Sequence, residues 1–293
     1  MHERDFLSEQ FEEHRPHLRT VAYRMLGSLT EADDAVQDSW LRVSRSATSD
    51  IENMRGWLTT VVSRVCLNML RSRASRREEP MTVHVPDPIV TSADAEHEMV
   101  LADSVGLALL VVLETLAPAE RLAFVLHDMF GMSFDDIAPV VGRTPTATRQ
   151  LASRARRRVR GAAPDRAAVD RRGQREVVEA FLAAARRGDF EALLAVLDPD
   201  VIHRSDRGIA NIGASAITRG AQAVARNATM FAQMAKSVQH VLVNGDAGFV
   251  AFTGDGEPMS LLSFTIEGGR IIEINAIVDP VRLRRLLGDG MRG

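Results

Sequence analysis

The sequence is poor in cysteine, in lysine and in aromatic side chains. Cys66 is the only cysteine, so the chain can form neither an internal disulfide nor a cysteine-ligated zinc site, and this fits a reducing compartment. No apolar run approaches the length needed to cross a membrane, and residues 1–15 lack the apolar core of a signal peptide. We therefore expect a cytoplasmic protein that does not associate with membranes.

The charges are distributed unevenly, although the formal net charge of the 293 residues is only −3. Arginine supplies nearly all the positive charge, since Lys236 is the only lysine. The arginines gather in residues 71–77 and 143–160, and no carboxylate interrupts the second run. GC-rich coding also produces many arginines, so their number alone does not identify a nucleic-acid-binding protein. Their segregation does favour a contact with an acidic partner.

The clearest local pattern is that of a helix-turn-helix. Ser133 is a good N-cap, and Asp136 three residues later can complete a capping box. Gly142 suits the left-handed residue that ends the first helix, and Thr144 followed by Pro145 suits the start of the second. The segment therefore predicts two short helices joined by a tight turn.

The second of these helices has an apolar side and an arginine-rich outer side. In a helix-turn-helix the second helix enters the major groove, where Arg and Gln side chains can reach base edges and phosphates. An ordinary solvated surface helix is the alternative, and the capped helix just before it argues against that alternative. Pro139 should make the first helix short or kinked. The side chains predicted to contact DNA are Arg149, Gln150, Ser153, Arg154 and Arg157.

Three further helices are predicted near the N-terminus from apolar residues at helical spacing. The first spans residues 6–26, the second is capped by Thr30, and the third runs over residues 54–77 into a basic stretch. The second helix has an apolar side that includes Trp40 and Leu41 and an acidic, amide-bearing side.

These segments, RMLGSLTEADDAVQDSWLRV and RGWLTTVVSRVCLNMLRSRASRRE, followed by the helix-turn-helix, resemble extracytoplasmic-function (group IV) sigma factors of bacterial RNA polymerase. The likeness covers about the first 160 residues. It implies that residues 23–42 correspond to region 2.2, which binds the β′ clamp helices of the core polymerase. An acidic helix face suits a basic partner surface, although a solvated face is the alternative. The residues implied in this contact are Asp34, Gln37 and Asp38.

The same resemblance implies two promoter contacts. Residues 44–77 correspond to regions 2.3 and 2.4, which open the duplex and read the −10 element, and an extruded base needs a pocket to offset its unstacking. Residues 99–160 correspond to region 4, which reads the −35 element as duplex and contacts the β flap of the polymerase. The candidates for −10 recognition are Asn53, Arg55, Arg64 and Asn68.

The C-terminal part, residues 174–293, alternates helices and strands and resembles a SnoaL-like domain of the NTF2 type. We call it the tail. Gly268 and Gly269 suit the tight turn of a β-hairpin between its last two predicted strands. Such domains contain a pocket, and many of them are cyclases or isomerases that use His and Asp. His203, Asp206 and His240 are the candidates here, but the spacing of His203 and Asp206 on a strand places them on opposite faces, which argues against a catalytic pair.

Sigma factors with a fused SnoaL-like tail use it for regulation, and partial matches to their motifs occur in this chain. HVPDP in the linker resembles their WLPEP-like motif, with His84 and Val85 in place of its aromatic-aliphatic start. DRG resembles a glycine-rich DGGG motif with one glycine instead of three, and VDPVRL resembles a terminal NPDKL motif. The implied regulatory residues of the tail are Asp206, Gly208, Asp279, Pro280 and Arg282.

The predicted fold is therefore multidomain, with two all-α sigma domains (a region 2 helical bundle and a region 4 helix-turn-helix) followed by an α+β NTF2/SnoaL-like cone. We expect a sigma factor that binds core RNA polymerase and promoter DNA, is not an enzyme, needs no cofactor or metal, and can be controlled by its tail and by an anti-sigma factor. The alternatives are a ligand-responsive DNA-binding regulator and a SnoaL-type cyclase or isomerase with a DNA-binding appendage. The predicted domains are region 2 at 1–79, a linker at 80–98, region 4 at 99–160, a second linker at 161–173 and the tail at 174–293.

Overall fold

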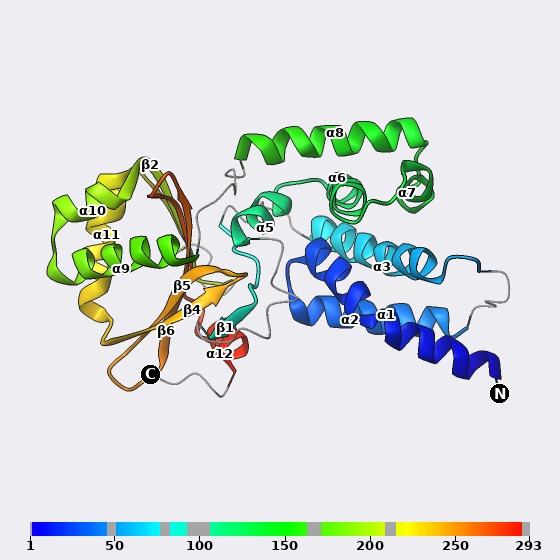
Figure 1. The fold of residues 1–293 in the computed structure, drawn as a ribbon, viewed down its shortest axis with the longest axis horizontal. Coiled ribbons are helices and arrows are strands. Elements are labelled where there is room, and N and C mark those ends of the chain that lie inside the picture. The colour runs from blue at the N-terminus through cyan, green and yellow to red at the C-terminus, as the bar shows by residue number, and fades with distance from the viewer. Residues whose placement is uncertain are drawn as a thin grey trace. The chain divides into compact units, whose positions relative to one another are not determined.

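The computed structural model describes residues 2–45, 51–76, 83–92, 106–162, 171–208 and 215–288. The chain divides into two compact units, each built from two stretches of sequence. The first unit combines residues 1–80 with residues 112–162, and its described residues are helical. The second combines residues 81–111 with residues 163–293 and contains a β-sheet (Figure 1).

Three helices open the first unit, as predicted: α1 (His2–Leu26), α2 (Leu29–Val43) and α3 (Met54–Arg76). The predicted cap of the second helix was wrong, because Ser28 and not Thr30 holds the N-cap position. Gly27 has a φ of 71°, which reverses the chain within one residue and leaves Ser28 as the extended residue before the helix. The three helices bury a shared apolar core that includes Phe11, Leu18, Val21, Ala35, Val36, Leu58 and Val62.

Helix α5 (Leu107–Glu114) spans the boundary between the two units in sequence. The first unit is completed by α6 (Pro118–Phe124), the π-helical turn η1 (Val125–Met129), α7 (Phe134–Val141) and α8 (Pro145–Ala162). The helix predicted from about residue 95 to 116 is described only over α5, and residues 93–105 lie outside the described residues. Helix α7 is short and contains Pro139, as predicted. Helices α6 and α7 pack against both α3 and α8, so the two helical modules share one core.

Within the described residues the tail sheet has seven strands in the order β1-β4-β5-β6-β7-β2-β3. All neighbouring strands are antiparallel except β2 and β7, which are parallel. The predicted hairpin between β6 and β7 is confirmed, with Gly268 and Gly269 both at positive φ. The strands are β1 (Val90–Ser92), β2 (Leu197–Asp206), β3 (Ala216–Arg219), β4 (Ser237–Val243), β5 (Asp246–Phe252), β6 (Pro258–Glu267) and β7 (Arg270–Ile277).

Helices α9 (Arg171–Arg187), α10 (Phe190–Val196) and α11 (Ala221–Met234) pack on the sheet from one side and close its apolar core (Figure 1). Helix α12 (Pro280–Leu287) follows the last strand and packs on β6. The sequence did not predict β1, β3 or α12. The most consequential of these is β1, because it comes from the segment predicted as a linker and pairs with β4 of the tail.

Candidate functional site

The helix-turn-helix is held by the caps that the sequence predicts. The Ser133 hydroxyl accepts a hydrogen bond from the Asp136 amide at 3.1 Å and donates one to the Asp136 carboxylate at 2.6 Å. Gly142 ends α7 with a φ of 69°, and the Thr144 hydroxyl accepts from the Ala147 amide at 3.2 Å. The angle between α7 and α8 is therefore set by residues within the motif itself.

Helix α8 is seated by small side chains. The sequence pattern predicts Leu151, Ala155 and Val159, four residues apart, on the inner face of this helix. Thr148, Ala152 and Ala155 are fully buried, whereas Leu151 and Val159 are only half-buried. The buried stripe is thus rotated from the predicted one, because α8 lies close enough to α6 and α7 for alanine and threonine to fill the contact. All five side chains predicted to contact DNA are exposed: Arg149, Gln150, Ser153, Arg154 and Arg157.

Carboxylates from the preceding helices hold part of the arginine face of α8. Glu120, which is 5% exposed, accepts from Arg154 Nε at 2.8 Å and from Arg158 Nη1 at 2.5 Å. Asp128 accepts from Arg156 Nε at 2.5 Å. Arg149 instead lies over the Phe134 ring, 5.2 Å from its centroid. Arg154 is therefore anchored to its own domain, which a search for acids within the helix could not show.

A polar stripe follows the exposed side of α2. Asp34, Gln37 and Asp38 are exposed, as predicted, while Ala35, Val36 and three further side chains of the helix are buried. Leu41, which we predicted on the inner side, is instead 49% exposed. It lies three residues after Asp38 and four after Gln37, so it shares their side of the helix. We call Asp34, Gln37, Asp38 and Leu41 the α2 stripe.

The four candidates for −10 recognition lie on or just before α3, and all are exposed. Asn53 caps the helix, since its side-chain oxygen accepts from the Gly56 amide at 2.9 Å. Arg55 Nη2 lies 3.1 Å from His17 Nδ1, and burial together with the Arg55 charge lowers the pKa of His17 to about 4. Arg64 and Asn68 are one helical turn apart on the open face.

In the second unit, two of the predicted regulatory residues meet the HVPDP segment. Asp206 is 1% exposed, and its carboxylate accepts from the Val85 amide at 2.9 Å and from Arg282 Nη1 at 2.7 Å. Arg282 also donates to the Val85 carbonyl at 2.6 Å and to Asp87 Oδ1 at 2.6 Å. His84 Nδ1 lies 3.3 Å from the Asp206 carboxylate. We call His84, Val85, Asp87, Asp206 and Arg282 the linker clamp.

The electrostatics of the clamp favour an ionised Asp206. Burial alone would raise the pKa of this carboxyl group. Hydrogen bonds from His84, Val85 and Gly208, together with the Arg282 charge, outweigh burial and lower the pKa of Asp206 well below its usual range. The attraction also affects Arg282. Burial alone would lower the pKa of this guanidinium, but the negative charges of Asp87 and Asp206 raise it.

The other predicted tail residues support the clamp. Asp279 caps α12 by accepting from the Val281 and Arg282 amides, and Pro280 takes the first helical position. Gly208 donates its amide to Asp206 at 2.9 Å and has a φ of 80°. A Cβ atom at Gly208 would lie 1.8 Å from Asp279 Oδ2. The single glycine of the DRG motif is therefore required by both its backbone conformation and the space around it.

Comparison with known proteins agrees with this arrangement. Residues 10–76 match the family model for Sigma-70 region 2, residues 106–159 match Sigma-70, region 4, and residues 178–276 match the SnoaL-like domain. The chain is 36% identical over 298 residues to the probable ECF RNA polymerase sigma factor SigI of Mycobacterium tuberculosis, covering 99% of this chain and 100% of that protein. It is 37% identical over 287 residues to the ECF RNA polymerase sigma factor SigJ of the same organism, covering 92% and 91%.

The crystal structure of Mycobacterium tuberculosis extracytoplasmic function sigma factor SigJ superposes with a TM-score of 0.74 at 33% identity, over 94% of this chain and 98% of that one. This chain belongs to the extracytoplasmic-function sigma factors. Like SigJ, this sigma factor ends in a SnoaL-like domain of α+β architecture. Within the described residues, no helix is long and apolar enough to cross a membrane.

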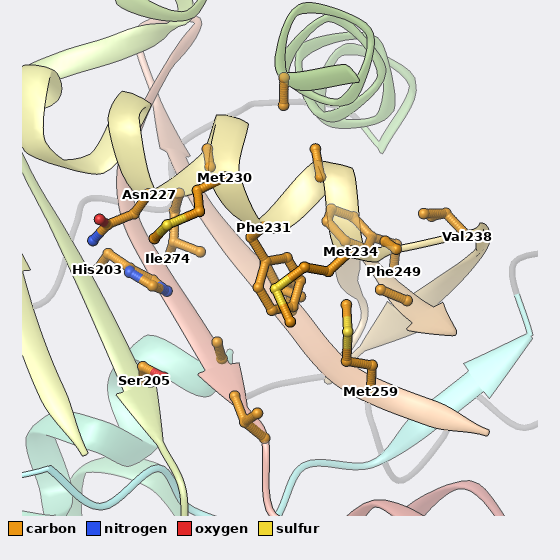
Figure 2. Close-up of a pocket in the computed structure, with 18 of the residues that line it drawn as sticks. His203, Ser205, Asn227, Met230, Phe231, Met234, Val238, Phe249, Met259 and Ile274 are labelled. Carbon is orange, nitrogen blue, oxygen red and sulfur yellow. The ribbon is translucent and has the colours of Figure 1, made fainter. Parts of the chain in front are cut away.

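The tail of this sigma factor encloses a cavity of about 700 Å³ between α9, α11 and the sheet. His203 points into it from β2 (Figure 2), whereas Asp206 lies in the linker clamp. The prediction that these two side chains lie on opposite faces of the strand is confirmed. His240 lies on β4 and is not among the residues that line this cavity.

Some residues of this sigma factor contribute to the clamp without having been singled out from the sequence. Asp87 pairs with Arg282 and Arg285, and Asn244 accepts from the Ile89 amide at 2.7 Å through its side chain. Asn244 has a φ of 51° in the turn between β4 and β5. The Asn-Gly dipeptide between two apolar runs is a hairpin signal and could have located this turn. Its contact with the linker has no signature in the local sequence.

Proposed function

We propose that this sigma factor binds core RNA polymerase and directs it to promoters that have −10 and −35 elements, while the polymerase itself forms the phosphodiester bonds. The observation that carries the proposal is that two exposed surfaces of suitable chemistry, the α2 stripe and the arginine face of α8, lie in the segments that match Sigma-70 regions 2 and 4. The chain thus presents both a surface for the enzyme and a surface for its template.

The α2 stripe is the proposed contact with the β′ clamp helices. Asp34 and Asp38 provide negative charge, and Leu41 provides an apolar side chain that its own domain leaves 49% exposed. Charged groups that flank an apolar contact orient a partner and raise the rate of encounter, while the apolar contact adds affinity. Region 4 is the proposed site for the β flap.

Helix α8 is the proposed reader of the −35 element. Arg149, Gln150, Ser153 and Arg157 are exposed, and within the described residues neither of these arginines forms an ion pair with a carboxylate. Arg154, held by Glu120, is better placed to contact a phosphate than to read a base. On α3, Arg64 and Asn68 are the proposed contacts to the −10 element, with Arg55 and the capping residue Asn53 beside them.

The tail is proposed to regulate the sigma module in cis through the linker clamp. The described part of the linker forms strand β1 of the tail sheet and is bound by Asp206 and Arg282, so its conformation depends on the tail. A linker held in this way cannot at the same time bind elsewhere in extended form. Among the lining residues of the cavity, Glu257 is the only carboxylate and it is exposed, so we propose no catalytic activity for the tail. An anti-sigma factor is a further proposed partner.

Transcription by purified core polymerase tests the proposal. The full-length chain should support synthesis of a run-off transcript from a promoter selected from random DNA, and the triple change Asp34→Ala, Gln37→Ala and Asp38→Ala should abolish both the transcript and binding to core polymerase. The matched control changes Glu9, Gln10 and Glu13 to Ala, since these are also two acids and an amide near the surface of one helix. Equal losses in the two triple variants, or normal activity in both, would refute the assignment of the α2 stripe.

A further inference from the structure

The cavity of the tail has the size of a small-molecule site. Its volume is about 700 Å³, within the range of about 300–1,000 Å³ found for ligand pockets. It lies between α11 and the sheet, so its walls come from elements that are fixed by the tail core. The lining comes from three helices and six strands and is largely apolar, with side chains that include Phe181, Phe231, Val238, Phe249, Met259 and Ile274.

One end of the cavity is polar but uncharged. His203 and Ser205 project from β2 and Asn227 from α11, and Figure 2 shows His203 and Asn227 close together. Asn227 Nδ2 donates to Thr218 Oγ1 at 3.2 Å, which leaves its carbonyl oxygen as an acceptor. The His203 ring, unlike its backbone, makes no hydrogen bond to another described residue. Burial lowers the pKa of His203 and so favours the neutral ring, which offers one N–H donor and one acceptor.

The lining also contains four charged residues, and all of them reach solvent. Arg186, Arg207, Glu257 and Arg284 are all exposed, and Glu257 lies 3.8 Å from Arg284. Neither His203 in its neutral form nor Asn227 carries a charge, so a charged group held between these two side chains would lose its hydration without gaining a counter-charge from them. The polar end therefore suits a hydroxyl or a carbonyl group.

Methionines make part of the wall adaptable. Met230 and Met234 lie one turn apart on α11 and are 64% and 61% exposed, and Met259 on β6 lies beside Met234 in Figure 2. Exposed apolar side chains beside a cavity gain from being covered, and unbranched methionines can adjust to ligands of different outline.

From these observations we propose that the tail cavity binds an uncharged, largely apolar small molecule with a hydroxyl or carbonyl group that is hydrogen-bonded by His203 and Asn227. Ligand binding itself does not depend on the proposed sigma activity. The cavity also shares two elements with the linker clamp: β2 presents His203 to the cavity and Asp206 to the clamp, and α12 presents Arg284 to the cavity and Arg282 to the clamp. A bound molecule is thus placed to act on the linker.

The test uses the full-length protein and two tetracyclic probes of similar size. Benzanthrone is a fluorescent ketone, and benz[a]anthracene is a hydrocarbon without the oxygen. We expect benzanthrone to bind with the higher affinity, and its emission to shift as it enters an apolar site. Ala228→Trp, which fills the cavity, should lower the affinity for both probes at least about tenfold. His203→Phe should lower the affinity for benzanthrone about tenfold and leave that for benz[a]anthracene unchanged.

His240→Phe is the matched control, because it makes the same replacement on β4 outside the cavity lining, and it should leave both affinities unchanged. Far-ultraviolet circular dichroism establishes that each variant is folded. If Ala228→Trp does not fold, the His203→Phe comparison decides alone. Binding of neither probe to the wild-type chain, or equal effects of the His203 and His240 changes, overturns the proposal, whatever the result of the transcription assay.

Discussion

At the scale of single residues, Asp206 shows how a buried carboxylate can join distant parts of a chain. It bonds to the amide of Val85, 121 residues earlier, and to Arg282 near the end of the tail. Such a group is costly to bury alone and becomes favourable only when hydrogen bonds and an opposite charge are supplied together. The contacts with His84, Val85 and Arg282 therefore offset the cost of burying Asp206 and tie the linker to the tail.

This predicts an acid-sensitive tail. The pKa of Asp206 is lower in the folded chain than the value of about 3.9 expected when it is unfolded, so its contribution to stability is complete at neutral pH and is lost as the pH falls below about 4. Asp206→Asn should lower the melting temperature at pH 7. The melting temperature of this variant should also fall less between pH 5 and pH 3 than that of the wild type. Thermal unfolding followed by circular dichroism across this range checks the prediction, and parallel declines in the two proteins would count against it.

Gly208 gives a second prediction at this scale. Gly208→Ala places a methyl group on Asp279 and also forces an alanine to a φ of 80°, so it should destabilise the tail by more than the roughly 1–2 kcal/mol expected from the left-handed backbone alone. Gly268→Ala is the control, because its φ is also positive but no atom lies within 4 Å of the added carbon. Urea unfolding of both variants measures the difference, and equal losses would show that the clash with Asp279 is relieved.

At the scale of elements, α8 combines two groups of arginines with different tasks. Arg154, Arg156 and Arg158 are tied to Glu120 and Asp128 and help to hold the helix on its domain. Arg149 and Arg157 form no ion pair with a carboxylate among the described residues. A helix that must stay attached while it enters a groove needs both kinds.

We therefore expect Arg157→Ala to remove a phosphate contact, which should weaken the binding of promoter DNA and reduce the number of ions released on binding by about one. Arg158→Ala is the matched change at an arginine that is paired with Glu120. It should lower the stability of the domain and leave the salt dependence of DNA binding close to that of the wild type. Fluorescence anisotropy of a labelled −35 duplex at several salt concentrations, with thermal unfolding of each variant, separates the two effects. Identical salt slopes for wild type and Arg157→Ala would contradict the prediction.

At the scale of the whole molecule, the linker belongs to the tail in space, although it lies between the two sigma modules in sequence. Residues 83–92 add β1 to the tail sheet and connect through Asp87 to Arg282 and Arg285. Removing the tail therefore also removes the partner of the linker, so the two effects cannot be separated by truncation alone.

A point change can separate them. If the tail acts through the clamp, Arg282→Ala in the full chain should shift the yield of run-off transcript in the same direction as truncation near Gly161. Arg226→Ala, an exposed arginine of the tail on α11, should leave the yield unchanged. A truncation that alters the yield while Arg282→Ala does not would show that the tail acts through contacts other than the clamp.

The sequence determined the features that depend on neighbouring residues. The caps at Ser133 and Thr144, the left-handed Gly142 and the short proline-containing helix α7 are all as predicted, because each is decided within about one turn of helix. The same holds for the exposure of Asp34, Gln37 and Asp38, which follows from helical periodicity. The resemblance to known family motifs identified the modules. The alternation of side chains along a strand predicted that His203 and Asp206 lie on opposite faces.

Only the tertiary structure decided which distant groups meet. Local sequence could not show that Glu120 holds Arg154, that Leu41 is left exposed, or that Asp87 finds Arg282 across 195 residues. Nor could it place β1 beside β4 or His203 beside Asn227 at one end of a cavity. These contacts follow from how helices and strands pack, and packing depends on the shapes of surfaces that the chain brings together only when it folds. The DNA-binding motif is thus determined by the sequence around it, whereas the linker clamp and the cavity exist only in the folded tail.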